Sequence, residues 1–447
     1  MLQPGRSSKP CALPDTERKL KNYTEHNRHC TPIHLKICFL LTLSFIVIFS
    51  SASVFAEGLF DLADGEFKKA GYIGVEGRYF FQKPKQEGQS DHQFDPSLAA
   101  EPELSFSWNS YSDTLMAKPF FRLATDGYDP DRTHFDIREL YWLHNTERWS
   151  FKCGFIKEFW GVTESRHLVD IINQTDFVDG ASPDDKLGQP AAHFVFRTDY
   201  GSFNAYMMPY FREGTFPSRK GRLRGVYPVD VDQPVYESDD KMHHTDYAFR
   251  YFHVIGPVDL GLSYFQGTGR EPRVTLGTDD EGYTVLIPNY DLIKQASIDM
   301  QYTWDAWLFK IEAYRRYGHV TDYNAYVAGL EYTTFGVAES NTDVGFLLES
   351  IYDGREWGDP PTTFNRELYT GIRILLNDAA DTTFLAGVTF DTNTWSRTYT
   401  GNFRTRFFDH YVLKIEWTAF GDVDEEEMVL KAMEQDANVK IKLDYYF

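Results

Sequence analysis

The feature that most constrains the fold is an alternation of apolar and polar residues with a period of two. In the last nine residues, Val439, Ile441, Leu443, Tyr445 and Phe447 alternate with Lys, Asp and Tyr. The same pattern recurs at 258–265, 295–302, 307–314 and 411–419. A strand places successive side chains on opposite faces, so each segment has one apolar and one polar face. Segments of about ten residues with this pattern are typical of strands that cross a membrane at a tilt.

The connections between these segments alternate in length. Eight short ones lie near 110–113, 145–148, 199–202, 255–258, 304–306, 335–342, 377–381 and 408–410. Nine longer ones span 82–102, 125–133, 158–192, 213–244, 268–293, 318–322, 354–363, 393–402 and 421–437. Transmembrane barrels have short turns at one end and long loops at the other. The sequence therefore predicts an all-β fold, a transmembrane antiparallel β-barrel of about 18 strands, or sixteen if 103–109 and 193–199 are not strands.

Two other fold classes are alternatives to this barrel. A mean hydropathy of −0.44 excludes a helical transporter, which needs many apolar spans of about 20 residues. A soluble β-sandwich or propeller would also show alternating strands. However, tryptophans lie mostly near the short turns, as in the aromatic girdle of a membrane barrel. They are Trp108, Trp142, Trp149, Trp304, Trp307 and Trp417.

The first 56 residues are predicted to be a leader. His34 and Lys36 precede an apolar core at 37–50, and Val54-x-Ala56 follows it. This order matches a secretory signal peptide with cleavage after Ala56, the alternative being an N-terminal membrane anchor. The polar stretch 1–35 is unusually long for such a leader, so the sequence does not show which codon is the true start. Residues 57–447 are then one barrel domain with a single cysteine, Cys153, so neither a disulfide nor a cysteine-based metal site is expected.

Two segments carry a resemblance to a known group. The last strand, with Tyr445 and a terminal Phe447, resembles the assembly signal of Gram-negative outer-membrane β-barrels. Residues 154–176, GFIKEFWGVTESRHLVDIINQTD, resemble a Trp-Gly…Asp…Asn…Asp segment of porin-like outer-membrane proteins. The resemblance implies an outer-membrane location among lipid and lipopolysaccharide, and recognition of the last strand by the barrel-assembly machinery. Homo-oligomers occur in that group, but no segment here indicates an interface.

A barrel of 16–18 strands leaves an aqueous lumen, whose charge decides what passes. Residues 57–447 contain 38 basic and 63 acidic residues, a balance that argues against nucleic acid as a partner. The parity that faces the lumen nevertheless contains 13 basic against nine acidic residues. The alternative is a solvated interior in which opposite charges pair across strands. The candidate selectivity residues are Arg78, Arg122, Arg250, Arg316, Arg373, Arg404 and Arg406.

The loop 158–192 is the candidate constriction. It combines apolar residues at 168–172 with charged ones, and a loop that folds into a barrel needs apolar contacts of its own. The resemblance implies such folding, because a comparable loop narrows related porins; the alternative is an external lid. The residues proposed for the constriction are Glu158, Trp160, Glu164, Arg166, His167, Asp170 and Asp176.

Other motifs point to no further chemistry. A basic cluster, Arg219, Arg222 and Arg224, suggests either attraction of anions, including lipopolysaccharide phosphates, or a solvated loop. His243-His244 has no obvious third metal ligand. There is no Gly-x-Ser-x-Gly, no His-Glu-x-x-His and no phosphate-binding glycine loop. We expect neither an enzyme nor a cofactor or metal site.

The expected function is passive diffusion of small hydrophilic solutes, with anionic solutes as a candidate class. Two alternatives remain at this point. One is an export conduit for an acidic polysaccharide, and the other is a plugged barrel with a structural or adhesive role. The sequence identifies neither the solute nor the direction of transport.

Overall fold

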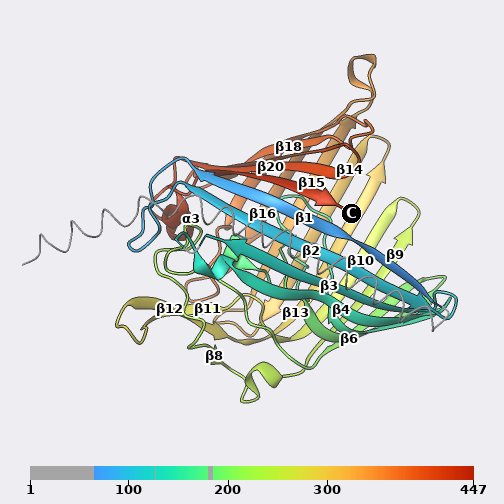
Figure 1. The fold of residues 1–447 in the computed structure, drawn as a ribbon, viewed down its shortest axis with the longest axis horizontal. Helices are drawn as coiled ribbons and strands as arrows, with labels where there is room; N and C mark the ends of the chain where they lie inside the picture. The colour runs from blue at the N-terminus through green and yellow to red at the C-terminus, as the bar shows by residue number, and fades with distance from the viewer. Residues whose placement is uncertain (1–64, 126, 180–184) are drawn as a thin grey trace, which may run out of the picture. The chain divides into compact units, whose positions relative to one another are not determined.

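The structure is a computed structural model that describes residues 65–125, 127–179 and 185–447. The predicted leader and its cleavage site lie outside these residues. Eighteen of the described strands form one antiparallel sheet that closes on itself (Figure 1). They are β1 (Glu66–Phe80), β2 (Phe94–Trp108), β3 (Asp113–Ala124), β4 (His134–Asn145), β5 (Trp149–Ile156), β6 (Gln189–Thr198), β7 (Gly201–Met208), β9 (Asp246–Ile255), β10 (Val258–Thr268), β13 (Leu292–Trp304), β14 (Trp307–Tyr317), β15 (Tyr323–Thr334), β16 (Asp343–Asp353), β17 (Arg366–Leu375), β18 (Thr383–Asp391), β19 (Arg397–Phe407), β20 (Tyr411–Gly421) and β21 (Asn438–Tyr446).

Pairing of the first and last strands closes the barrel. β1 pairs with β21 from Tyr72 opposite Tyr446 to Phe80 opposite Asn438, and every other barrel strand pairs with its sequence neighbours in the sheet. The predicted transmembrane antiparallel barrel of about 18 strands is therefore confirmed, and the sixteen-strand alternative is wrong. The two weak segments are both strands, within β2 and β6.

The predicted alternation of connection lengths is also confirmed. All eight short turns join the strand pairs expected, and the nine longer connections lie at the other end, here called the long-loop end. Two predicted loops are shorter than expected. β2 begins at Phe94 although 82–102 was predicted as loop, and β19 begins at Arg397 although 393–402 was predicted as loop. Both stretches contain alanine, glycine or proline at positions where an alternating pattern would show larger apolar residues.

The outer face of the barrel is apolar where the alternation predicts it. Leu262, Ile298 and Ile441 are exposed on it, as are Trp304 and Trp307 beside a short turn. So continuous an apolar band is unfavourable in water and favourable in lipid, so this face is the one that contacts the membrane. No helix in the described part of the chain is long and apolar enough to cross a membrane.

The inner face departs from the expected polar pattern over β14–β17. There, inward-facing apolar residues are almost fully buried in a cluster that includes Leu168 of the loop between β5 and β6, the second of two clusters inside the barrel. The first joins residues of the same loop to strands from β5 to β13. A loop therefore packs against this part of the wall. The wall residues of the second cluster are Tyr314, Tyr323, Ala325, Val327, Leu347, Ile351 and Tyr369.

An irregularity in β3 and β4 helps to position that loop. The register shifts between Lys118 and Pro119, and proline cannot donate to the ladder at this point. The bulge lies beside Asp136 and Arg138 of β4, which are both buried inside the barrel.

Shorter elements lie at the long-loop end. β8 (Val235–Tyr236), β11 (Arg273–Thr278) and β12 (Thr284–Tyr290) form a three-stranded sheet. The α-helix α3 (Met428–Met433) lies in the loop before β21. Three short 3-10 helices lie at the same end: η3 (Pro130–Arg132), η4 (Phe177–Asp179) and η5 (Lys241–His243). A fourth, η6 (Val337–Glu339), lies in a turn at the opposite, short-turn end.

Candidate pore constriction

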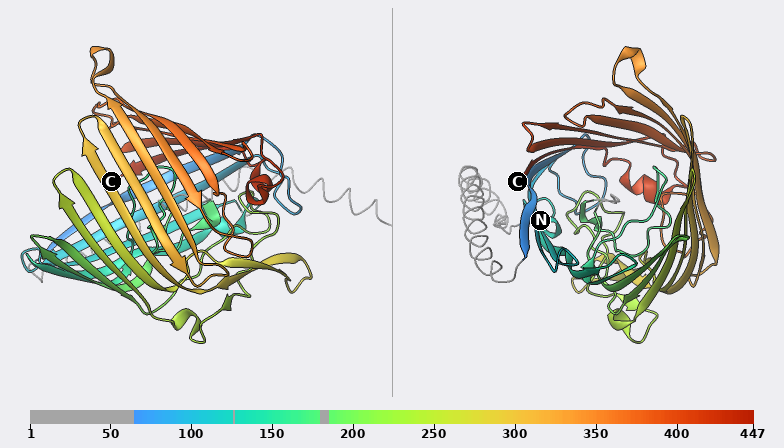
Figure 2. Two further views of the ribbon diagram at one scale, coloured as in Figure 1. Left: turned by 180° about the vertical axis from the view of Figure 1, so that it is seen from behind. Right: turned by 90° about the vertical axis from the view of Figure 1, so that its right-hand side faces the viewer.

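The loop between β5 and β6, described over residues 157–179 and 185–188 and here called the inner loop, lies within the ring of strands. In Figure 2 (right), segments of loop are seen inside the ring. Glu312 on the inner face of β14 holds the loop there. One oxygen of its carboxylate accepts hydrogen bonds from the backbone N–H of Val162 (2.7 Å) and Thr163 (3.0 Å) and from the Thr163 hydroxyl (2.7 Å). The other accepts one from the Val169 N–H (3.2 Å). Four donors stabilise a carboxylate that is fully buried and would otherwise be costly.

A second wall carboxylate holds the next residues of the loop. Glu349 on β16 accepts hydrogen bonds from the backbone N–H of Glu164 and Ser165, both at 2.8 Å, and from the Ser165 hydroxyl at 2.5 Å. The Glu164 side chain then forms an ion pair with Arg373 on β17. The inner loop thus runs from β5 across the lumen and contacts β14, β16 and β17 in turn.

Apolar contacts complete this attachment. Leu168 is buried in the cluster of wall residues on β14–β17. Trp160 is buried on the other side of the lumen, where its ring meets that of Tyr206 edge-on and the Arg250 guanidinium lies 5.0 Å from its ring centroid. Burying these apolar groups compensates for the ordering of a long segment.

The base of the inner loop is held by polar contacts with β4 and the following loop. The Asp176 carboxylate accepts hydrogen bonds from Arg138 (2.8 Å) and from the Thr215 hydroxyl (2.6 Å), and lies 3.1 Å from His134 Nε2. Burial alone would raise the pKa of Asp176, but the hydrogen bond from His134 and the charge of Arg138 hold it well below its ordinary value. For Asp170, burial raises the pKa despite Lys186 at 3.3 Å.

The structure brings all seven predicted constriction residues into this assembly. Beyond those already described, Glu158 pairs with Lys152 (2.9 Å) and lies 3.6 Å from His193. Arg166 pairs with Asp353 at the end of β16 (2.9 Å). His167 lies 3.8 Å from Glu312. The external-lid alternative does not fit these contacts with the inner wall. The constricting role itself stays a prediction.

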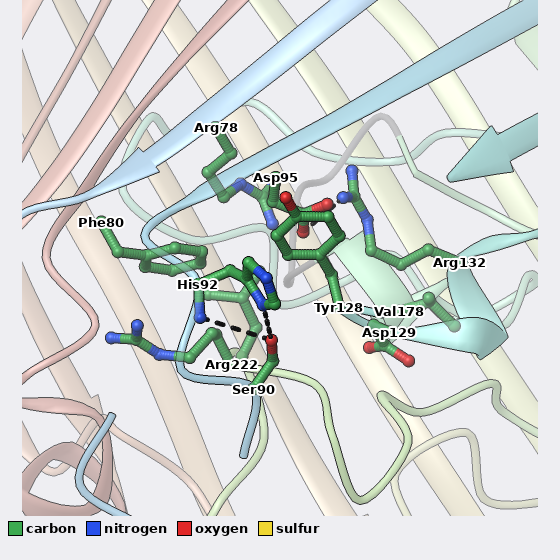
Figure 3. Close-up of a pocket in the computed structure, with 11 residues that line it drawn as sticks. Arg78, Phe80, Ser90, His92, Asp95, Tyr128, Asp129, Arg132, Val178 and Arg222 are labelled. Atoms are coloured by element: carbon green, nitrogen blue, oxygen red, sulfur yellow. Dashed lines mark hydrogen bonds and ion pairs between the residues drawn. The ribbon is translucent and has the colours of Figure 1, made fainter. Parts of the chain in front are cut away.

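Four of the seven predicted selectivity arginines are covered by loops. Arg78 and Arg122 are buried beside Glu76, to which Arg132 from η3 also binds at 2.8 Å. Figure 3 shows Arg78, Asp95 and Arg132 around a cavity of about 10 Å³, no larger than one water molecule needs. Arg250 forms two bonds with Asp299 (2.6 and 2.8 Å), and Arg316 binds Gln295 and Glu271. All four lie beside carboxylates, as the charge-pairing alternative predicts, but they are covered by loops and not solvated, and the partner of Arg316, Glu271, belongs to a loop.

The other three arginines are accessible to water. Arg373 pairs with Glu164 of the inner loop, and Arg404 pairs with Asp381 in a short turn. Arg406 is exposed on the same face of β19 as Arg404. Of the seven predicted selectivity arginines, these three are the ones exposed to the lumen.

The inner loop covers one part of the wall and leaves another open to water. On β15, the inward-facing Ala325 and Val327 are only 1% and 0% exposed. On β20, the side chains of Lys414 and Glu416, which also face inward, are 34% and 43% exposed. The inward-facing residues of β18 other than Asp391 are half-buried in the same way. Water therefore reaches the inner faces of β18 and β20.

Glu312 and Glu349 are two of the nine acidic residues that the sequence predicts on the lumen-facing parity, but their role as anchors of the loop was missed. Asp353 was missed altogether. A signal for this was present in the sequence. Over β14–β17 the parity expected to face water contains Tyr, Ala, Val, Leu and Ile. Apolar residues on both faces of a barrel strand indicate that something packs against it from inside.

The basic cluster at 219–224 is not a solvated loop. Arg222 and Arg224 are buried, and both donate to backbone carbonyls of other long-loop segments, Gln82 and Gln435 for Arg222 and Glu87 for Arg224. Arg222 also pairs with Asp436 at 2.9 Å. These two arginines bind loops together at the long-loop end and are not placed to attract solutes.

Comparison with known proteins gives likeness in fold only. No protein-family model matches the chain, and no curated protein matches it. A solved structure of the outer-membrane protein OmpT of Vibrio cholerae, with loop L8 deleted, is 13% identical and covers 86% of this chain and 100% of its own, with a TM-score of 0.44. Wzi of Escherichia coli, an outer-membrane carbohydrate-binding β-barrel involved in group 1 capsule assembly, is 10% identical over 84% of each chain, with a TM-score of 0.48. A mutant of the Rh. blastica porin is 13% identical over 86% of this chain and 100% of its own, with a TM-score of 0.41.

Proposed function

We propose that this barrel is a diffusion channel of the outer membrane, in which the inner loop narrows the lumen and small hydrophilic solutes pass between that loop and the wall formed by β18–β20. The observation that carries the proposal is the unequal covering of the wall. The loop is bonded to Glu312 and Glu349 on one side, while Lys414 and Glu416 on the other side remain open to water. A loop held by wall carboxylates keeps a fixed aperture.

The proposal favours anionic solutes. Arg373, Arg404, Arg406 and Lys414 are the accessible cations along the open wall, and Glu164, Asp381 and Glu416 are the accessible anions beside them. A narrow, low-dielectric passage magnifies a small excess of one charge. The effect is a modest anion preference. The proposal assigns the protein no catalytic activity.

Planar-bilayer recording of the purified protein tests this function. The expected result is stepwise single-channel conductance, with a reversal potential in a KCl gradient that indicates anion preference. Absence of conductance at every voltage would instead support a plugged structural barrel. A wide, unselective conductance that a long acidic polysaccharide blocks from one side would support the export conduit. Export by the predicted signal peptide and assembly through the strand ending in Tyr445 and Phe447 belong to the same proposal.

A further inference from the structure

Three arginines from separate parts of the chain meet at one carboxylate, that of Glu271 in the loop between β10 and β11. Arg316 of β14 lies 2.5 Å from Glu271, and Arg355 of the loop after β16 lies 3.3 Å from both carboxylate oxygens. Arg166 of the inner loop lies 3.7 Å away. This group is here called the arginine triad. It lies beside the constriction, because one of its members belongs to the inner loop.

The triad is held in place by contacts other than Glu271. Arg316 also donates to Gln295 (2.8 Å) and to the Tyr323 hydroxyl (3.1 Å). Arg355 and Arg166 both bind Asp353, at 3.0 and 2.9 Å. The three guanidinium groups would therefore remain close together if Glu271 moved away, as a preorganised binding site requires.

Glu271 is more exposed to water than the triad. Its side chain is 37% exposed, whereas those of Arg355, Arg316 and Arg166 are 3%, 6% and 14% exposed. Within the described chain, its hydrogen bonds and ion pairs all come from the triad. Burial would raise the pKa of Glu271, but the three guanidinium groups hold it well below its ordinary value, so it is ionised. The Glu271 carboxylate thus lies between the three buried guanidinium groups and water.

The net charge of this cluster favours binding of an additional anion. Three arginines face two carboxylates, Glu271 and Asp353, which gives an excess of one positive charge. Without Glu271 the excess would be two. Guanidinium groups present donors in a geometry that matches carboxylate and phosphate oxygens.

We propose that Glu271 occupies a binding site for the oxyanion group of a small solute, a carboxylate or a phosphate, and that such a solute displaces it. This inference rests on the proposed function and deepens it by naming the solute class and the place where it binds. The carboxylate of Glu271 imitates the solute in its absence. When the solute replaces it, the three buried guanidinium groups exchange one anionic partner for another.

Titration of the detergent-solubilised protein with inorganic phosphate, followed by calorimetry, tests the inference. Replacement Glu271→Gln removes the competing charge with little change in size. We expect phosphate to bind about tenfold tighter than in the wild type, since one charge-assisted contact no longer has to be exchanged. Glu281→Gln is the matched control, because Glu281 is an exposed carboxylate nearby in the chain, in the turn between β11 and β12. The double variant Glu271→Gln with Arg355→Gln should lose the gain, and glucose should bind none of the proteins.

Equal affinities in the Glu271→Gln and Glu281→Gln variants would overturn the inference. A second measurement uses the wild type alone, so it does not depend on the folding of a variant. Saturating phosphate should speed hydrogen–deuterium exchange in residues 269–272, and unchanged exchange would contradict displacement. Neither readout needs current through the barrel. A protein that binds phosphate as described but does not conduct would therefore refute the proposed function and leave this site standing.

Discussion

Thr163 gives both its backbone N–H and its hydroxyl to one carboxylate oxygen of Glu312, at 3.0 and 2.7 Å, although the two residues are 149 positions apart. This pair joins the inner loop to the opposite wall of the barrel. It converts a loop that would otherwise move into a fixed partition of the lumen. The proposed aperture of the channel depends on this attachment.

Replacement Glu312→Gln should loosen the inner loop. The amide group of glutamine presents a donor where Glu312 accepts from Val169 or from Thr163, so at least one buried N–H loses its partner. Such a loss costs about 1–3 kcal/mol. We expect noisier single-channel currents and faster hydrogen–deuterium exchange over residues 161–170.

Glu416→Gln provides the matched control for that experiment. Glu416 also lies on the inner wall, but it is 43% exposed and forms an ion pair with Lys440. Its replacement should leave exchange in the inner loop unchanged. If Glu312→Gln and Glu416→Gln behave alike, the attachment at Glu312 does not fix the loop.

Charge reversal at two accessible arginines should change ion selectivity. The double variant Arg404→Glu with Arg406→Glu replaces two positive charges on the inner face of β19 by negative ones. We expect the permeability ratio of chloride to potassium to fall, measured as the reversal potential in a KCl gradient. Arg397→Glu is the control, since Arg397 lies on the same strand with the opposite parity. An unchanged ratio in the double variant would show that ions do not pass this wall.

The base of the inner loop should resist mild acid. The folded-state pKa of Asp176 is below the value of about 3.9 expected in an unfolded chain, so the carboxylate stabilises the folded loop at pH above about 4. This contribution is lost as the pH falls toward the folded-state pKa. Exchange near Asp176 should stay slow from pH 7 to pH 5. In Asp176→Asn it should be faster already at pH 7, and equal rates at pH 7 would contradict the anchoring role.

Two neighbouring positions on β18 test which face meets lipid. Val388 faces outward and Thr389 inward, since Thr389 lies opposite the buried, inward-facing Tyr369. Val388→Arg places a charge in lipid, at a cost of about 2–4 kcal/mol near the bilayer centre, while Thr389→Arg places it in water. The first variant should refold poorly into vesicles and the second well, as judged by heat-modifiable migration. The reverse order would mean that the assigned parity is wrong.

Much of the barrel could be predicted because strand parity and turn length are local properties. The segment 438–446 shows its two faces in nine residues, and each short turn is marked where it occurs. The start of β2 was missed because Pro96, Ala99 and Ala100 do not display an apolar side clearly. These residues nevertheless belong to a strand, because β1 pairs with β2 along this whole stretch.

The candidate site was predictable only in outline. The apolar and charged mixture at 158–176 indicated that the loop needs partners, and this is what the structure shows. Which partners it finds depends on contacts such as Thr163 with Glu312, and no local pattern encodes a pairing over that distance. The role of Glu271 could not be predicted either, because three arginines far apart in sequence define it. Those arginines meet only after the barrel has closed.

Thiol accessibility inside the barrel shows whether solutes pass along the β18 side of the inner loop. Cys153 is first replaced by serine. Two single-cysteine proteins are then made in this background, one with Thr389→Cys and one with Ala325→Cys. An anionic methanethiosulfonate reagent is added during bilayer recording. We expect the reagent to reduce the current of the Thr389→Cys protein and to leave that of the Ala325→Cys protein unchanged, because Ala325 is buried in the cluster that includes Leu168. Block at Ala325→Cys without block at Thr389→Cys would contradict this expectation.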